Sequence, residues 1–444
     1  MYEKISELLT GRKFAEIRKL LSDANPVDIA QMFEELDEED VIRVFRLLPK
    51  EVAAETFSYM SSEAQKNIVE SMTDRELSGI IDELFLDDTV DLIEEMPASV
   101  VKKVLANTFG EKRSLINRFL QYKEDSAGSI MTIEFVDLKK EMTVEKAFEH
   151  IRKTGVDKET IYTCYVIDAN RVLEGVITVK DLLLAAPSDI VGDIMDTNII
   201  YATTDEDKED VAHIFHKYDF MSLPVVDKEK RLVGIVTFDD AMDVMEEENT
   251  EDFEKMAAIM PSERPYLKTS IFEHAKHRIV WLMVLMISAT FTGAIISSFE
   301  DAFKVIPVLV AFIPMLMDTG GNSGSQTSTL IIRGMALGEI EGRDVLRVWW
   351  HEIAVSLILG AALAAVSILK TYFLNGRDMW LSITVSLSLY ATVIIAQSIG
   401  CLLPIAVKKV GLDPAVAASP IITTIVDACA LSIYFAVAKT FMGL

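Results

Sequence analysis

A single carboxylate stands in the middle of the last apolar stretch of the sequence. Asp427 lies within Pro414–Ala438, a run that holds no other charged residue. On insertion scales, a carboxylate at the centre of a membrane-spanning helix costs at least about 2.5–3.5 kcal/mol, so such residues mark ion or substrate pathways. Asp427 is therefore the first candidate for a functional residue. The alternative is a structural Asp that is protonated or hydrogen-bonded.

A second unusual segment interrupts an earlier apolar run. Between Pro314 and Thr329 the sequence combines three glycines with amide and hydroxyl side chains; the residues of interest are Gly320, Gly321, Asn322, Gly324 and Gln326. Amide side chains at membrane depth belong on a water-filled cavity or in a helix–helix contact, and small residues allow helices to approach closely. Both interpretations, pore lining and close packing, stay open here.

A third group is a run of acids without a base. Nine acids occur in the segment 239–254, namely Asp239, Asp240, Asp243, Glu246, Glu247, Glu248, Glu251, Asp252 and Glu254. Carboxylates about 5 Å apart repel by roughly 3 kcal/mol at an effective dielectric near 20. A hard divalent cation such as Mg²⁺ or Ca²⁺ relieves that repulsion through oxygen ligands. The alternative is a solvated acidic helix.

The apolar runs predict a membrane domain. Five of them approach or exceed the roughly 20 residues that a spanning helix needs: Ile279–Ser298, Val305–Ile332, Ile353–Leu369, Met379–Val407 and Pro414–Ala438. Lys and Arg flank alternate ends, beginning with Arg264, Lys268, Lys276 and Arg278 before the first run. Because basic loops stay in the cytosol, we expect the N-terminus inside and, with five spans, the C-terminus outside.

Charge divides the chain into two halves. Residues 271–444 contain 11 acids and 11 Lys or Arg, so the segment 1–270 carries the whole net charge of −26. An acidic chain of this kind is not expected to bind nucleic acid, because phosphate contacts need a basic face. The three cysteines, Cys164, Cys401 and Cys429, are isolated, and the N-terminus lacks the order of a signal peptide. A reducing cytosolic setting is expected for the acidic half.

The segment 1–125 reads as an array of short helices. Pro49, Ser61 and Thr73 are evenly spaced and each precedes an apolar-periodic stretch. Such units are too short to bury their own apolar faces and must stack on one another. Acids such as Asp87 and Asp88 then fall in first turns, where they suit the helix dipole.

A different repeat begins near residue 126. Ser129-Ile-Met-Thr132, followed by residues 165–183, is echoed by Asp193-Ile-Met-Asp196 and residues 224–242. The repeated strand–turn–strand–helix pattern resembles a tandem cystathionine-β-synthase (CBS) pair. Such pairs often bind ATP or another adenine nucleotide near Thr-x-x-Asp segments, here Thr178 to Asp181 and Thr237 to Asp240. A purely structural module is the alternative.

Taken together, the order of segments resembles the MgtE family of magnesium channels over essentially the whole chain. The resemblance implies a multidomain fold: an all-α superhelical N domain (1–125), an α/β tandem CBS pair (126–246), an acidic connecting helix (247–270) and an α-helical bundle of five spans (271–444). It also implies a homodimer in the lipid bilayer of the cell membrane, with the pore on its two-fold axis, and no enzymatic activity.

The resemblance assigns residues to two kinds of site. It gives the pore Asp427 and the segment Gly320–Gln326, with further ion sites at Asp413 and Glu352. Regulatory metal ligands carried over are Asp87, Asp91, Asp207, Glu209, Asp219, Asp240, Asp243, Glu248, Glu251 and Asp252. Two departures, Ser419 before Pro420 and Ser325 before Gln326, stand where the family often has Asn and bear on ion preference.

The expected mechanism is import of Mg²⁺ through a pore that cytosolic Mg²⁺ closes by bridging the acidic domains. A transporter for Co²⁺ or Ni²⁺ is one alternative, although softer metals favour His or Cys and His351 is the only histidine after His277. A CBS-regulated membrane phosphotransferase is the other, although the apolar runs carry only single, separated carboxylates.

Overall fold

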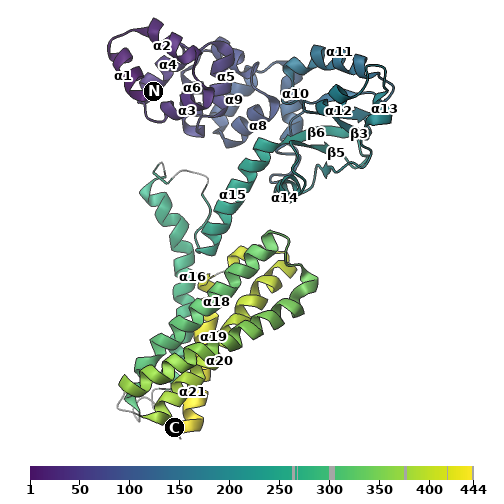
Figure 1. Cartoon of the computed structure of the whole chain (residues 1–444). Helices are drawn as coiled ribbons and strands as arrows, with labels where there is room; N and C mark the ends of the chain where they lie inside the picture. Colours follow the sequence, from purple (N-terminus) through teal and green to yellow (C-terminus); the bar gives the residue numbers. More distant parts are fainter. Residues whose placement is uncertain (263–265, 268, 300–305, 375–377, 418, 443–444) are drawn as a thin grey trace. The chain divides into compact units, whose positions relative to one another are not determined.

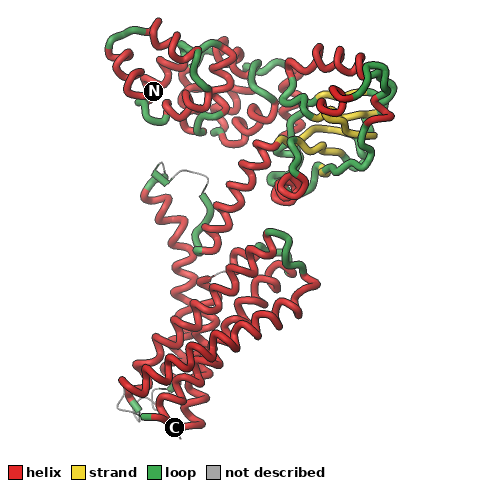
Figure 2. Tube along the Cα trace, viewed as in Figure 1, coloured by secondary structure: helices red, strands yellow, loops and turns green. Residues whose placement is uncertain are grey.

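The computed structural model describes residues 1–262, 266–267, 269–299, 306–374, 378–417 and 419–442. The chain divides into two compact units, Met1–Met245 and Glu246–Leu444, whose elements are drawn in Figures 1 and 2. Arg264 and Lys268, which precede the first apolar run, lie outside the described residues, as do the loop residues Glu300, Asp301, Lys304 and Arg377.

The first unit begins with ten short helices (Figure 1). They are α1 (Tyr2–Thr10), α2 (Phe14–Ser22), α3 (Pro26–Phe33), α4 (Glu38–Phe45), α5 (Lys50–Ser58), α6 (Ser62–Ser71), α7 (Asp74–Ile81), α8 (Leu86–Glu95), α9 (Ala98–Ala106) and α10 (Gly110–Phe119). Pro49, Ser61 and Thr73 are the N-caps of α5, α6 and α7. The predicted helix starts are therefore confirmed, and Asp87 and Asp88 do fall in the first turn of α8.

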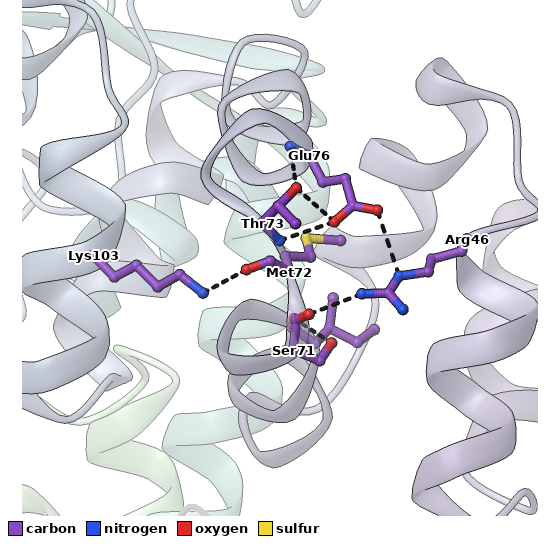
Figure 3. Close-up of polar contacts among 7 residues, drawn as sticks. Arg46, Ser71, Met72, Thr73, Glu76 and Lys103 are labelled. Carbon is purple, nitrogen blue, oxygen red and sulfur yellow. Dashed lines mark hydrogen bonds and ion pairs between the residues drawn. The ribbon is translucent and has the colours of Figure 1, made fainter.

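Basic side chains hold the array together by binding helix ends. At the α6–α7 junction, Arg46 donates to the carbonyl of Ser71 at 2.9 Å, and Lys103 donates to the carbonyl of Met72 at 2.7 Å (Figure 3). On the other side of the junction, Thr73 and Glu76 form a capping box that begins α7. A cation at a helix C-terminus satisfies free carbonyls and suits the helix dipole. Residues about three helices apart are thereby joined.

The second part of this unit contains two small sheets in which the same topology occurs twice. In the first, β1 (Val136–Leu138) is parallel to β2 (Thr163–Ile167), which is antiparallel to β3 (Leu173–Thr178). In the second, β4 (Ala202–Thr203), β5 (Ser222–Val226) and β6 (Leu232–Thr237) pair in the same way. The helices are α11 (Val144–Thr154), α12 (Val179–Leu184), α13 (Val191–Ile194) and α14 (Lys208–Tyr218). The predicted duplication is confirmed.

The two repeats exchange their leading segments. Thr132, which precedes the first repeat, pairs with Ile235 of β6, and Asp196, which precedes the second, pairs with Val176 of β3. The methionines beside them fill the space over two glycines: Met131 lies against Gly234, and Met195 lies against Gly175, with no room for a Cβ at either position. The Ile-Met dipeptides and the glycines of the sequence repeat are therefore packing partners between repeats.

Helix α15 (Phe238–Met256) carries the acid run. It starts directly after β6, earlier than the expected connecting helix at 247–270, and it ends earlier because Ala258 adopts a positive φ of 53°. Helix α15 starts early because the last helix of the CBS pair and the connecting helix form one continuous helix.

The second unit contains five long helices: α16 (Ile271–Ser298), α18 (Ile313–Ala336), α19 (Val345–Leu374), α20 (Met379–Lys409) and α21 (Ser419–Met442). Four of these, α16, α19, α20 and α21, are long and apolar enough to cross a membrane. Five such spans are therefore not confirmed among the described residues, because the Gly, Ser, Thr, Asn and Asp content of α18 lowers its hydropathy. Short 3₁₀ turns at Pro307–Phe312 and Pro414–Ala417 shorten the second and fifth predicted runs.

Candidate functional site

The glycines of α18 are contact residues between helices. A Cβ on Gly320 would lie 2.7 Å from Thr392 of α20, and one on Gly321 would lie 2.9 Å from Thr423 of α21. Gly324 meets Ile422 of α21 in the same way, and also lies directly against Gly400 of α20. Small residues allow helices to approach within backbone contact. Close packing therefore accounts for Gly320, Gly321 and Gly324.

The amide residues of the same helix lie elsewhere. Asp318, Asn322 and Gln326 follow one another at intervals of four residues and are all exposed in the single chain, so they share one face of α18. Asn322 donates to Asp318 Oδ1 at 3.2 Å. The two interpretations of this segment thus apply to different residues: the glycines pack against other helices, and the amides lie on a polar face that is exposed in the described chain.

Asp318 is a residue that the sequence reasoning passed over. Gly324 touches Ile422, whereas Gly320 touches Val426, so α18 and α21 run in opposite directions. Continuing that register brings Asp318 level with Asp427, and its charge acts on Asp427. The signal was available, since Asp318 is the other carboxylate at comparable depth in an apolar run. Asp427 itself is half-buried.

Two further predicted ion ligands have protein partners. Glu352, near the start of α19, accepts a hydrogen bond at 3.1 Å from Thr327 of α18. Asp413, in the loop before α21, accepts one at 2.6 Å from the ammonium of Lys255. Glu251, one turn before Lys255 on α15, accepts another at 2.6 Å. Asp413 and Glu251 are thus joined by a lysine of the chain.

The first unit contains a crowded group of carboxylates, which we call the acidic cluster: Asp87, Asp88, Asp91, Asp240 and Glu159. The first three are on α8, Asp240 is in the first turn of α15, and Glu159 follows α11. Residues far apart in sequence therefore meet here, all within one compact unit.

Burial, followed by mutual repulsion, raises every pKa in the acidic cluster. The pKa of Asp87 rises well above its ordinary value because the group is partly buried and faces Asp240 and Asp88. Desolvation and the charge of Asp240 raise the pKa of Asp88 to about 6, and they also raise the pKa of Asp91, although Asp91 as a whole residue is exposed. Burial and the charge of Asp239 raise the pKa of Asp240 to about 6. Burial and the charge of Asp88 raise the pKa of Glu159 to about 7. Without a cation, the ionised cluster is therefore destabilised.

Lys112, whose charge acts on Asp88, is held by other partners. Lys112 donates to the carbonyls of Ile81 and Leu84 at 2.6 Å each, which fixes its ammonium at the end of α7. Burial lowers the pKa of Lys112, although Glu134 and the nearby aspartates oppose that shift. In addition, Glu159 Oε2 is buried without a hydrogen-bond partner among the described residues. An oxygen-only donor set of this kind suits Mg²⁺.

The predicted acids of the second CBS repeat have local roles as well. Asp207 is the N-cap of α14 and accepts the amide of Glu209 at 3.0 Å. Asp219 ends the same helix in the left-handed conformation, with φ 54° and ψ 40°. Glu209 lies 3.6 Å from His213. These positions are exposed or half-exposed and remain accessible to an ion.

The remaining acids lie along α15: Asp243 and Glu248, which are exposed and half-exposed, and the half-exposed Asp252. Within the described residues of this single chain, no group of three His, Cys, Asp or Glu side chains is arranged to hold a metal ion by itself.

The two Thr-x-x-Asp segments differ in accessibility. Thr178 and Asp181 are exposed and form the capping box of α12, in which the hydroxyl and carboxylate are hydrogen-bonded to each other. Thr237 is buried and donates to Asp240 at 2.5 Å. Both segments begin a helix, which leaves their carboxylates beside free amides. Asp240 of the second segment also belongs to the acidic cluster, whereas Thr178 and Asp181 of the first segment do not.

Comparisons with protein-family models cover most of the chain. A model described as a divalent cation transporter, MgtE, matches residues 313–437, and one for the MgtE intracellular N domain matches residues 24–125. The CBS domain model matches twice, at residues 127–188 and 191–247.

Individual proteins agree with these matches. The magnesium transporter MgtE of Thermus thermophilus is 38% identical over 327 residues, which is 74% of this chain and 72% of that protein. The magnesium transporter MgtE of Bacillus subtilis is 34% identical over 80% of this chain and 78% of its own length. A crystal structure of the cytosolic domain of the Mg²⁺ channel MgtE in complex with ATP is 37% identical, with a TM-score of 0.53, covering 55% of this chain and 100% of that one.

Proposed function

The chain belongs to the MgtE family of magnesium transporters, and we propose that it imports Mg²⁺ as a homodimeric channel of the cell membrane, held shut by cytosolic Mg²⁺. The observation that carries the pore proposal is the pair of level carboxylates, Asp318 and Asp427, beside the polar face of α18. Relatives named as transporters also make an enzymatic role unnecessary.

The polar face of α18 supports the homodimer. Asp318, Asn322 and Gln326 are exposed in one chain, and side chains of this kind do not face lipid. A second copy related by a two-fold axis would cover them and enclose a water-filled path. Two copies of Asp427 would give that path a formal charge of −2, and two copies of Asp318 would double it.

Magnesium chemistry fits such a path. Mg²⁺ sheds its water reluctantly and is usually bound through one or two carboxylates with several waters retained. Carboxylates flanked by the amides of Asn322 and Gln326 can bind the hydrated ion through its water molecules. Glu352 lies near the start of α19, and Asp413 lies in the loop before α21. Both would supply further oxygen ligands near the entrance or exit of the path.

The acidic cluster supports the regulatory proposal. No three carboxylates of the described chain are arranged to hold an ion by themselves, so we infer that hydrated Mg²⁺ bridges them in pairs. Such bridging among Asp87, Asp88, Asp91, Asp240 and Glu159 would reduce the repulsion that raises their pKa values. Ions at Asp207, Glu209, Asp219, Asp243, Glu248, Glu251 and Asp252 would add to that effect in the dimer. Moving a gate from 1:99 to 99:1 takes about 5.5 kcal/mol of differential binding, which a few bridging ions can supply.

An adenine nucleotide, ATP in particular, is the proposed ligand of the CBS pair. A related cytosolic domain has been crystallised with ATP, and Thr178 and Asp181 are exposed at the start of α12. In the proposed topology the N-terminus and both CBS repeats are cytosolic, and the C-terminus after α21 is outside.

Flux into proteoliposomes at varied internal Mg²⁺ tests the proposal. We expect Mg²⁺ entry to fall as internal Mg²⁺ rises through the millimolar range, and Co²⁺ and Ni²⁺ entry to be slower than Mg²⁺ entry. Faster Co²⁺ or Ni²⁺ entry would favour the alternative cargo. Release of a phosphorylated product without ion flux would favour the phosphotransferase alternative instead.

A further inference from the structure

The acid-rich helix α15 ends on a basic residue with two close carboxylate partners. The ammonium of Lys255 lies 2.6 Å from Glu251 Oε1 and 2.6 Å from Asp413 Oδ2. The three side chains are 23%, 36% and 33% exposed, respectively. Contacts this short between opposite charges are charge-assisted hydrogen bonds. Lys255 therefore joins two segments that are far apart in the sequence.

Asp413 is also hydrogen-bonded to the segment that leads into α21, the helix that carries Asp427 and that we call the pore helix. Its Oδ1 accepts the amide of Ala415 at 2.8 Å, while Oδ2 accepts from Lys255. The 3₁₀ turn Pro414–Ala417 follows immediately, and α21 begins at Ser419. A displacement of Lys255 is therefore transmitted through few bonds to the helix that carries Asp427.

The end of α15 is also positioned by packing. Met256, next to Lys255, packs on a core formed by Ile331, Ile332 and Met335 of α18 with Cys401 and Ile405 of α20. Glu254 accepts the amide of Ser262 at 2.9 Å. These contacts place the Lys255 ammonium where it reaches both carboxylates, independently of any bound ion.

We propose that Lys255 is a tethered cation that occupies the position of a divalent ion between Glu251 and Asp413, and that it couples the acidic helix to the pore helix α21. The proposal rests on the proposed function, because the coupling acts on that gate. A free ion leaves when its concentration falls, whereas a lysine of the chain does not. The contact therefore persists at low Mg²⁺ and transmits movement of α15 in either direction.

Lys255 needs no bound ion to meet its two partners, since its ammonium lies 2.6 Å from each carboxylate. The ammonium thus balances both carboxylates while Mg²⁺ is low, so that rising Mg²⁺ acts first at the acidic cluster.

The first measurement needs no transport. Spin labels on cysteines introduced at Phe253 and Leu412, which are 74% and 63% exposed, report the distance between α15 and the loop before α21 in the full chain with its native cysteines replaced by alanine. We expect Lys255→Met to broaden the distance distribution without Mg²⁺. Lys255→Arg should keep it narrow, and the charge exchange Lys255→Glu with Asp413→Lys should restore it. An unchanged distribution in Lys255→Met would overturn the proposal.

The second measurement is flux at varied internal Mg²⁺. We expect Lys255→Met to need about tenfold more internal Mg²⁺ for half closure, the change expected from losing one hydrogen bond to a charged group. Lys409→Met, which removes an exposed ammonium at the end of α20, is the matched control and should behave as the unmodified chain. A broadened distance with unchanged closure would reject the coupling. If the unmodified chain shows no closure at all, the proposed gating fails, and the label distances still decide whether Lys255 joins the two segments.

Discussion

Carboxylates are arranged in opposite ways in the two units of the molecule. In the second unit, Asp318 and Asp427 are single residues on different helices, and Asp318 is exposed beside the amide of Asn322. In the first unit, Asp87, Asp88 and Asp240 are half-buried and lie within one another's electrostatic reach.

The difference separates two ways of using an ion. A site through which ions pass must hold them weakly enough to release them, so few carboxylates with access to water are suitable. A site that reports concentration must change its own stability when the ion leaves, so crowded and partly desolvated carboxylates are suitable. We expect changes in the first group to alter flux, and changes in the second to alter conformational stability.

The largest effect is expected for Asp427→Asn. Removing the central charge should lower Mg²⁺ flux about hundredfold, since a site charge within about 4–5 Å of the ion contributes several kcal/mol. Proteoliposome flux measures this, with Glu339→Gln in the loop after α18 as a control that should keep normal flux. Flux and ion preference equal to those of the unmodified chain would rule out Asp427 as the selecting residue.

A smaller loss is expected for Asp318→Asn. Because Asp318 lies on the exposed face of α18 rather than in a helix contact, its charge is more screened, and we expect flux to fall about tenfold. The same flux assay measures the loss, and Mg²⁺-dependent protection of the first unit from protease should not change. A variant that lost this protection would assign Asp318 to the folding of the chain rather than to the ion path.

In the acidic cluster, the expected effect is on stability. Asp88→Asn should stabilise the first unit against unfolding by about 2 kcal/mol without Mg²⁺. The pKa of Asp88 is raised by about two units, each worth about 1.4 kcal/mol, and losing a first-turn acid costs about 0.3–1 kcal/mol. Hydrogen exchange of α8 in the full chain measures it. Asp28→Asn, an exposed first-turn acid of α3, should be neutral or slightly destabilising. A cluster variant that behaves like this control would mean that repulsion is negligible.

The pH dependence is expected to be the smallest effect. The pKa values of Asp88 and Asp240 are raised from 3.8 to about 6, and that of Glu159 from 4.5 to about 7. The folded state therefore binds more protons than the unfolded chain between about pH 4 and pH 7, so stability should decrease as pH rises through that window. Hydrogen exchange of α8, corrected for intrinsic rates, should show less protection at pH 7.5 than at pH 5.5. Saturating Mg²⁺ should remove the difference, and protection that rises with pH would contradict the raised pKa values.

Local features were predictable from the sequence because their causes are local. Pro49, Ser61 and Thr73 mark helix starts since caps need particular residues at particular positions. The repeat in the CBS pair was visible because its strands and turns recur with the same residues. The apolar runs similarly indicated where the long helices lie.

Long-range placement was not predictable in the same way. The approach of Asp240 to α8 depends on how the helical array stacks, and the sequence of neither segment encodes its partner. Lys255 follows the acid run directly, yet its contact with Asp413 depends on the packing of Met256. Within residues 318–326 the glycines pack and the polar side chains are exposed. This difference could not be predicted without the positions of α20 and α21.

The exchange of segments between the CBS repeats has a consequence for the order in which the chain can fold during synthesis. Thr132 and Ile235 form a reciprocal pair of backbone hydrogen bonds, at 2.7 and 2.8 Å, so the edge next to the first repeat stays open until β6 has been made. Domains generally fold as units while the chain emerges, and an open strand edge can pair wrongly in the meantime. The first repeat therefore completes its pairing only after β6 has been made, and α15 follows β6 directly in the sequence. Folding of the CBS pair is thereby expected to finish shortly before the membrane helices are synthesised.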